Sequence, residues 1–158
     1  MIVLGLDPSL TCTGWGLVRV DGPRLSHIAN GQIATDTKSD LATRLHHLHD
    51  AVFAVLGAYK PDVAAIEEVF VNKNPQSTLK LAHARGAVLA ACGRASLPVH
   101  EHATRLVKKC IVGTGAADKT QVQAMLKVLL PLAKVSGADA ADALAVAIAH
   151  AHLAPNGH

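Results

Sequence analysis

The strongest constraint on the fold is a pair of short apolar runs, each followed at once by an acidic residue. Residues 2–6 (IVLGL) end at Asp7, and residues 63–66 (VAAI) end at Glu67. Short apolar runs bounded by turn signals indicate buried strands, and the helical spacing of apolar residues over 40–59 indicates a connecting helix. Such a crossover makes the two strands parallel neighbours, so Asp7 and Glu67 are expected at the same edge of one sheet.

The remaining elements extend this unit into a mixed α/β fold. Hydrophobic spacing and turn residues predict further strands over 14–20, 25–34 and 98–102, and further helices over 75–94, 103–112, 118–130 and 138–153. The second and third strands form a meander with the first. We therefore expect a mixed five-stranded sheet, an antiparallel meander plus parallel strands, flanked by helices. A single domain over residues 1–153 would leave a short tail over 154–158.

The last predicted helix is rich in alanine, yet it carries two carboxylates near its start. Asp139 and Asp142 are three residues apart and so share one face. One interpretation is helix chemistry, because Asp in a first turn accepts free backbone N–H groups and interacts favourably with the helix dipole. The other is that the pair joins Asp7 and Glu67 beyond the strand ends, where open α/β sheets bind ligands.

Four carboxylates in one crevice predict a metal site. Ionised acids at close range repel one another, and divalent cations such as Mg²⁺ or Mn²⁺, which prefer carboxylate oxygens, resolve that conflict. Two such ions about 4 Å apart can stabilise both the attacking and the leaving oxygen in phosphodiester hydrolysis.

The charge distribution favours a polyanionic partner. Residues 73–134 contain ten Lys or Arg and two acids, whereas the rest of the chain contains five Lys or Arg and ten acids. A basic block of this kind is typical of nucleic-acid contact, although a solvated basic surface is equally compatible with charge alone.

Other function classes have less support. The three cysteines form no CxxC pair, which favours a reduced, cytoplasmic protein. The apolar start of the chain is too short for a signal peptide or a membrane span. His100 with His102, and His150 with His152, are each at best half of a zinc site, so we expect surface or core histidines.

Four segments together resemble the RuvC family of bacterial Holliday-junction resolvases, within the RNase H-like (retroviral integrase) superfamily: LGLDPSLTCTGWG (4–16), AIEEVFVNKNPQSTLKLAHARG (65–86), RLVKKCIVGTGAADKTQVQAML (105–126) and ADAADALAVAIAH (138–150). The resemblance implies an RNase H-like fold and a metal-dependent endonuclease that resolves four-way junctions by paired symmetric nicks in recombination and repair. It makes Asp7, Glu67, Asp139 and Asp142 the catalytic acids, holding two Mg²⁺ ions for which Mn²⁺ substitutes.

The same resemblance assigns DNA contacts. Phe70 matches a residue that stacks on bases at the crossover, and Lys108 and Lys119 match basic residues that contact the backbone near the cut. Lys119 is also a candidate catalytic residue, stabilising charge on the phosphate. The loop Gly113-Thr114-Gly115 permits close approach of backbone N–H groups to phosphate. Further DNA contacts are expected from the basic block, at Lys73, Lys80 and Arg85.

The expected partners follow from that activity. Symmetric nicks require two active sites, which a homodimer supplies. We expect its seam on the helix over 75–94, at Leu79, Leu81, Ala82, Ala87, Val88 and Leu89. A branch-migration helicase complex is a further expected partner, whereas a membrane is not. The expected location is the bacterial cytoplasm, at the nucleoid when the protein is bound to DNA.

Two alternative functions stay open. One is an ATP-dependent phosphotransferase of the sugar-kinase and actin type, and the other is a junction-binding protein without catalytic activity.

Overall fold

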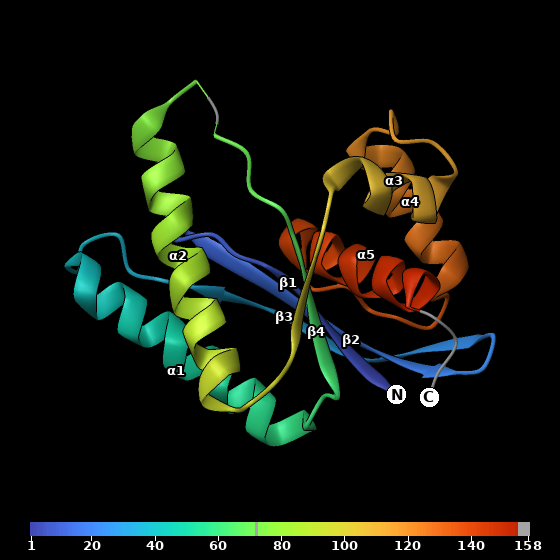
Figure 1. Ribbon diagram of the computed structural model, residues 1–158, viewed down its shortest axis with the longest axis horizontal. Coiled ribbons are helices and arrows are strands. Elements are labelled where there is room, and N and C mark those ends of the chain that lie inside the picture. Colours follow the sequence, from blue (N-terminus) through green and yellow to red (C-terminus); the bar gives the residue numbers. More distant parts are fainter. Residues whose placement is uncertain (72, 155–158) are drawn as a thin grey trace.

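A mixed sheet forms the centre of the fold and carries helices on both faces (Figure 1). The computed structural model describes residues 1–71 and 73–154. Within them the strands are β1 (Ile2–Asp7), β2 (Cys12–Asp21), β3 (Arg24–Ala34), β4 (Val63–Glu67) and β5 (Val99–His102), in the sheet order β3-β2-β1-β4-β5. β1 is antiparallel to β2 and parallel to β4, which confirms the predicted mixed topology.

The helices begin and end close to where the sequence places them. They are α1 (Leu41–Tyr59), α2 (Pro75–Arg94), α3 (Thr104–Val112), α4 (Lys119–Leu129) and α5 (Ala138–Leu153). Local capping explains the agreement: the Asp40 side chain accepts from the Thr43 N–H at the start of α1, and Asp118 and Gln121 form a capping box at the start of α4. Of the expected tail, Ala154 is described and residues 155–158 lie outside the described residues.

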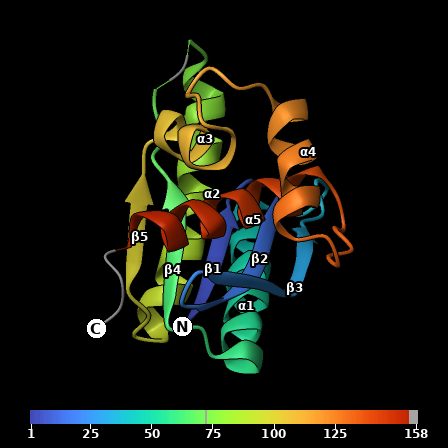
Figure 2. The same ribbon diagram turned by 90° about the vertical axis from the view of Figure 1, so that its right-hand side faces the viewer.

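One hydrophobic core lies on each face of the sheet. α1 and α2 cover one face, and α5 crosses the other together with α3 and α4 (Figures 1 and 2). The first core includes Leu4, Leu6, Leu17, Leu48, Val52, Ala64 and Val88. The second includes Val3, Val18, Ala65, Val107, Leu126, Leu144 and Ile148. Neighbouring residues of a strand point to opposite faces, so the continuous apolar runs of β1 and β4 supply both cores at once.

The structure corrects part of the expected dimer seam. Val88 is fully buried in the core between the sheet and α2, so it is not free to form a seam. Ala87 is partly buried and packs against the same core. The outward side of α2 instead carries Leu79, which is 60% exposed, and Ala82.

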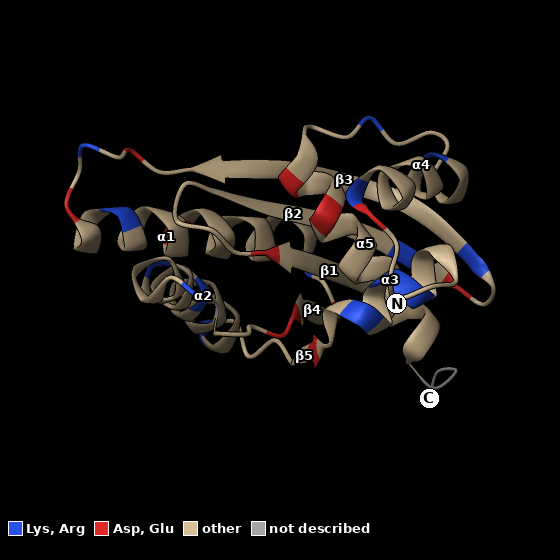
Figure 3. Ribbon diagram, turned by 90° about the horizontal axis from the view of Figure 1, so that it is seen from above, with Lys and Arg blue, Asp and Glu red and all other residues tan. Residues whose placement is uncertain are grey.

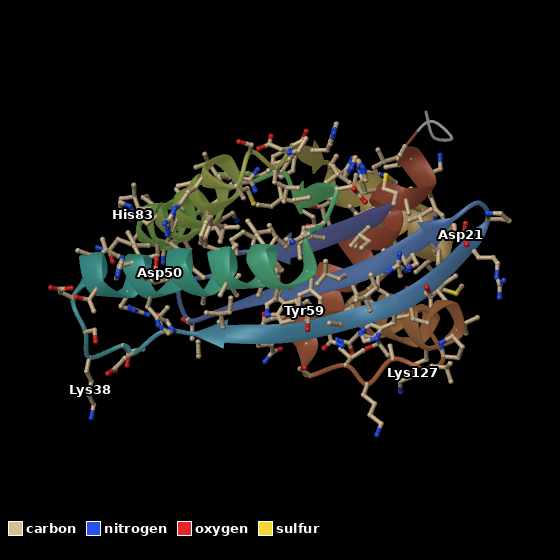
Figure 4. All side chains as sticks on the ribbon, turned by 90° about the horizontal axis from the view of Figure 1, so that it is seen from below. Asp21, Lys38, Asp50, Tyr59, His83 and Lys127 are labelled. Carbon is tan, nitrogen blue, oxygen red and sulfur yellow. The ribbon has the colours of Figure 1, made fainter. Side chains whose placement is uncertain are left out.

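The connections leave the carboxyl ends of β1 and β3 at the same end of the sheet. Asp7 pairs with Gly14, and Cys12 pairs with Ala34, so both strands finish beside the start of β2. Figure 4 shows Lys38, which follows β3, at this end, and Asp21 at the hairpin on the opposite end. The acids predicted from the sequence therefore lie at the end of the sheet away from the β2–β3 hairpin.

The helix α5 lies directly on the backbone of β1 and β2. A Cβ atom at Gly5 would overlap the carbonyl oxygen of Ala143, and one at Gly14 would overlap that of Asp139. Glycine in the strands and alanine in the helix thus remove the side chains that would hold the two elements apart.

This contact gives a first prediction. Gly5→Ala should lower the free energy of unfolding by about 1–3 kcal/mol, since its new methyl group meets backbone that cannot rotate away. Gly57→Ala is the matched control: Gly57 is exposed in α1 and nothing lies near its Cβ position, so this change should raise the stability by up to about 1 kcal/mol. Urea unfolding of the two variants measures both changes, and equal stabilities would contradict the close packing of α5.

Candidate active site

The fold brings the predicted acids to one place. Asp7 ends β1, and Glu67 ends the parallel neighbour β4, one residue beyond the paired Leu6 and Ile66. One carboxylate oxygen from each of Asp7, Asp139 and Asp142 lies within 4.8 Å of the others. Glu67 lines the same cavity as Asp7 and Asp142, which has a volume of about 210 Å³. Acidic segments at the ends of β1 and β4 are visible from above in Figure 3.

Glu67 is held by a residue that the sequence did not identify. The Thr104 hydroxyl, at the start of α3, donates a hydrogen bond of 3.0 Å to Oε2 of Glu67. Thr104 also lines the cavity. This bond fixes the orientation of the Glu67 carboxylate at the edge of the cavity.

The electrostatics of the cluster favour a bound cation. Burial, together with the nearby charges of Asp142, Asp139 and Glu67, raises the pKa of Asp7 to about 7, against the opposing effect of Lys119. Burial also raises the pKa of Glu67. A divalent ion among these oxygens offsets both burial and repulsion, and hard ions such as Mg²⁺ and Mn²⁺ prefer such ligands. The donor set therefore fits a divalent metal ion.

Two lysines complete the cavity. Nζ of Lys119, at the start of α4, lies 3.1 Å from Oδ2 of Asp142, and this contact raises the pKa of Lys119. Lys108 of α3 lines the cavity beside it. The Lys119 side chain is 72% exposed, so its charge reaches solvent at the mouth of the cavity. Both residues thus lie beside the acids, as the sequence predicted.

Arg85 has a different environment from the other expected DNA contacts. Its guanidinium donates to the backbone carbonyl of Glu67 and to the carboxylate of Glu101, and its side chain is only 12% exposed. Arg85 therefore ties α2 to the end of β4 and to β5. Lys73 and Lys80, by contrast, are exposed at the surface.

The other predicted contacts lie on exposed loops. Phe70 follows Glu67 by three residues and is 69% exposed, so it is not a core residue. Gly113 ends α3 with a positive φ of 92°, and Gly115 follows in the same loop. The hydroxyl of Thr114 accepts from the Ala116 N–H.

A histidine cluster joins two motifs that the sequence left separate. Nε2 of His102 lies 2.8 Å from Nδ1 of His150, and the ring centroids of His100 and His150 are 4.9 Å apart. Burial, together with the nearby His102 and His100, lowers the pKa of His150 to about 4, so this imidazole is neutral at neutral pH. Over residues 1–71 and 73–154, the compact group of three or more potential metal ligands is the acidic one, not this cluster.

The acids of α5 do not cap their own helix. Gly137 is the N-cap residue, and no side chain at that position binds the first turn. The backbone N–H groups of Asp139 and Ala140 instead donate to Oε1 of Gln32 on β3. The capping part of the helix-chemistry interpretation is thus not seen at the N-cap, although Asp139 lies in the first turn, where its charge interacts favourably with the helix dipole. Asp142 lines the cavity, and Asp139 lies beside Asp7 and Asp142.

A meander beside two parallel strands that each end on an acid is typical of an RNase H-like fold. The family model described as "Crossover junction endodeoxyribonuclease RuvC" matches residues 3–150, and the chain belongs to this RuvC family. No helix among the described residues is both long enough and apolar enough to span a membrane.

Relatives and solved structures agree with this assignment. RuvC of Erythrobacter litoralis is 69% identical over 96% of this chain and 93% of its own length, and RuvC of Sphingopyxis alaskensis is 68% identical over 96% and 97%. Thermus thermophilus RuvC, solved in complex with Holliday junction substrate, is 33% identical and superposes with a TM-score of 0.91 over 98% of this chain and 94% of that one. The yeast mitochondrial Holliday junction resolvase shares the fold, with a TM-score of 0.66 at 12% identity over 94% of this chain and 78% of that one.

The raised pKa of Asp7 predicts how stability depends on pH in the metal-free protein. Its folded-state pKa of about 7 lies above the ordinary 3.8, so its contribution to stability is complete below about pH 4 and is lost as the pH rises through 7. Asp7→Asn cannot ionise, so it should gain stability over the wild type from pH 4 to pH 7.5, by up to about 4 kcal/mol. Urea unfolding in EDTA across this range measures the difference.

Asp21→Asn, at the distant β2–β3 hairpin, is the control and should follow the wild-type curve at every pH. Parallel curves for Asp7→Asn and the wild type would show that Asp7 does not stay protonated in the folded protein.

Proposed function

We propose that this chain is a structure-selective, metal-dependent endonuclease that resolves four-way DNA junctions by paired symmetric nicks. The observation that carries the proposal is the convergence of one carboxylate oxygen from each of Asp7, Asp139 and Asp142 within 4.8 Å. Asp7 and Asp142 also line a cavity together with Glu67 and two lysines. The substrate is supported by the Thermus thermophilus relative, whose structure contains Holliday junction substrate.

The chemistry follows from the donor set. Two Mg²⁺ ions, for which Mn²⁺ substitutes, would be held by Asp7, Glu67, Asp139 and Asp142, and would supply the charge that stabilises the attacking and leaving oxygens. Asp7 would be ionised with a cation beside it, because a nearby cation lowers a carboxylate pKa. Thr104 keeps Glu67 oriented. Lys119 stabilises negative charge on the phosphate at the mouth of the cavity.

DNA binding is assigned to the basic and aromatic residues around the cavity. Lys108 and Lys119 bind the backbone near the cut, and exposed Phe70 stacks on a base at the crossover. Lys73, Lys80 and the loop Gly113-Thr114-Gly115 bind the arms. Arg85 is the exception among the expected contacts, since its guanidinium is already bound to Glu67 and Glu101.

Paired nicks require two such cavities. We assign the homodimer contact to the outward side of α2, around Leu79 and Ala82. Residues 1–153 would then act as one nuclease domain in each protomer. From the family resemblance we also propose a branch-migration helicase as a partner. The same resemblance favours action at the nucleoid in the bacterial cytoplasm.

The proposal is tested with a synthetic four-way junction and a linear duplex of matched sequence. Asp7→Asn, Glu67→Gln, Asp139→Asn and Asp142→Asn should each slow junction cleavage in Mg²⁺ by at least about 100-fold, because each removes a metal ligand. Binding of the junction in EDTA should stay at the wild-type level, since the basic residues supply phosphate affinity. Gel-based cleavage and fluorescence anisotropy measure the two quantities.

Asp50→Asn is the control, because Asp50 is an exposed acid on α1 outside the cavity. It should cut as the wild type does. If the wild type cleaved the linear duplex as fast as the junction, the proposed structure selectivity would be contradicted. An acid variant that cuts at a substantial fraction of the wild-type rate would exclude that acid from the site.

Phe70 supplies a separate prediction about junction selectivity. Phosphate contacts cannot distinguish a crossover from a duplex, whereas stacking on a disturbed base can. Phe70→Ala should cut junctions about 5–150-fold more slowly, which corresponds to a stacking energy of about 1–3 kcal/mol. Its Mn²⁺ affinity, measured by calorimetry, and its dimeric state, measured by sedimentation, should be unchanged.

Val71→Ala removes a neighbouring side chain that is 84% exposed, and it should cut at the wild-type rate. Full activity of Phe70→Ala would mean that the ring plays no part in the junction complex. A monomeric Phe70→Ala would place the dimer contact on this loop instead of on α2.

A further inference from the structure

The first turn of α5 is bound by a side chain from β3. Gly137, the N-cap residue, has no side chain to accept a hydrogen bond. Oε1 of Gln32 accepts instead from the backbone N–H groups of Asp139, at 3.2 Å, and Ala140, at 3.4 Å. The first N–H groups of a helix have no partner within the helix, and an N-cap side chain usually satisfies them. Gln32 therefore caps the N-terminus of α5, a role that a Ser or Asp at the N-cap position usually has.

Gln32 is also in line with Asp7 across the sheet. Gln32 pairs with Gly14 on β2, and Gly14 pairs on its other side with Asp7 on β1. Side chains of directly paired residues point to the same face. The missing side chain of Gly14 leaves the space that the backbone of Asp139 occupies. The backbone N–H of Asp139 is thus bound by Gln32, and its backbone carbonyl packs against Gly14. A carboxylate oxygen of Asp139 lies within 4.8 Å of one of Asp7.

A second amide on β3 secures the segment that leads into the helix. Oδ1 of Asn30 accepts from the backbone N–H of Ser136 at 2.8 Å and from its hydroxyl at 2.9 Å. Nδ2 of Asn30 donates to the carbonyl of Lys134 at 2.9 Å. These contacts end three residues before Asp139, so Asn30 holds the approach to the helix, and Gln32 holds the turn that carries the acid.

We propose that Gln32 is a positioning residue of the metal site: by binding the backbone of Asp139, it sets where that carboxylate lies relative to Asp7. The inference rests on the proposed function, since it assumes that Asp139 is a metal ligand. Gln32 acts only through Asp139 and does not touch the ion or the DNA. Residues that orient metal ligands commonly change metal affinity or activity by about 10–100-fold when they are replaced.

Gln32→Ala tests the proposal with two measurements that need no DNA. In metal-free protein, NMR-detected hydrogen exchange at the amides of Asp139 and Ala140 should become at least about 10-fold faster, because both lose their acceptor. Calorimetric titration with Mn²⁺ should show an affinity about 10-fold weaker than that of the wild type. Junction binding in EDTA should not change.

A compensating substitution separates positioning from a general loss of structure. A Cβ at Gly137 would overlap the Gln32 amide, and Gln32→Ala opens that space. The φ of Gly137 is 169°, extended backbone that any residue adopts. Gly137→Ser in the Gln32→Ala background therefore supplies an ordinary N-cap hydroxyl. It should restore both amide protection and Mn²⁺ affinity to near the wild-type level. Ser26→Ala, towards the other end of β3, should change neither.

Each outcome decides the proposal. Wild-type Mn²⁺ affinity in Gln32→Ala would overturn it, as would a weakened affinity that Gly137→Ser does not recover. If Gln32→Ala does not fold, Gln32→Asn replaces it, because its amide is one methylene too short to reach Asp139 and the same losses are expected. Asp139→Asn tests the underlying assumption: wild-type Mn²⁺ affinity in that variant would contradict the proposed metal site, whatever Gln32 does.

Discussion

The close approach of α5 to the backbone of β1 and β2 is the constraint on which the site depends. Gly5 lies under Ala143 and Gly14 under Asp139, with no side chain between strand and helix. A larger residue at either strand position would lift the helix and carry its acids away from Asp7. The alanines of α5 and the glycines of the strands therefore act together, because both allow the helix and the strands to pack closely. This close packing sets the spacing of the carboxylates.

That spacing is unfavourable in the absence of a cation. Burial and three neighbouring acids raise the pKa of Asp7 to about 7, so in the metal-free protein Asp7 is only partly ionised at neutral pH. The surrounding contacts oppose the repulsion from different elements: Lys119 binds Asp142, and Thr104 binds Glu67. The cavity thus combines carboxylates with a lysine and a hydroxyl from different elements. Such preorganised groups are suited to stabilising the negative charge of a phosphate under attack.

The sequence predicted what local patterns determine. Apolar runs, helical spacing and turn residues located each strand and helix, and the crossover between β1 and β4 placed Asp7 beside Glu67. The sequence could not predict contacts between residues far apart in the chain, such as Gln32 with Asp139 or Thr104 with Glu67. The reason is that a polar residue gives no local sign of its distant partner. The burial of Val88 was missed for a related reason: periodicity identifies the apolar positions of a helix, but not which of them meet the core.

The most direct test of the metal site is a crystal structure of the protein soaked in Mn²⁺, with anomalous diffraction measured at the manganese edge. We expect two anomalous peaks in the cavity, each about 2.0–2.3 Å from carboxylate oxygens of Asp7, Glu67, Asp139 or Asp142. The same soak of Asp7→Asn should lose at least one peak. Strong peaks at the imidazoles of His102 and His150, with none among the four acids, would contradict a catalytic metal site at the ends of β1 and β4.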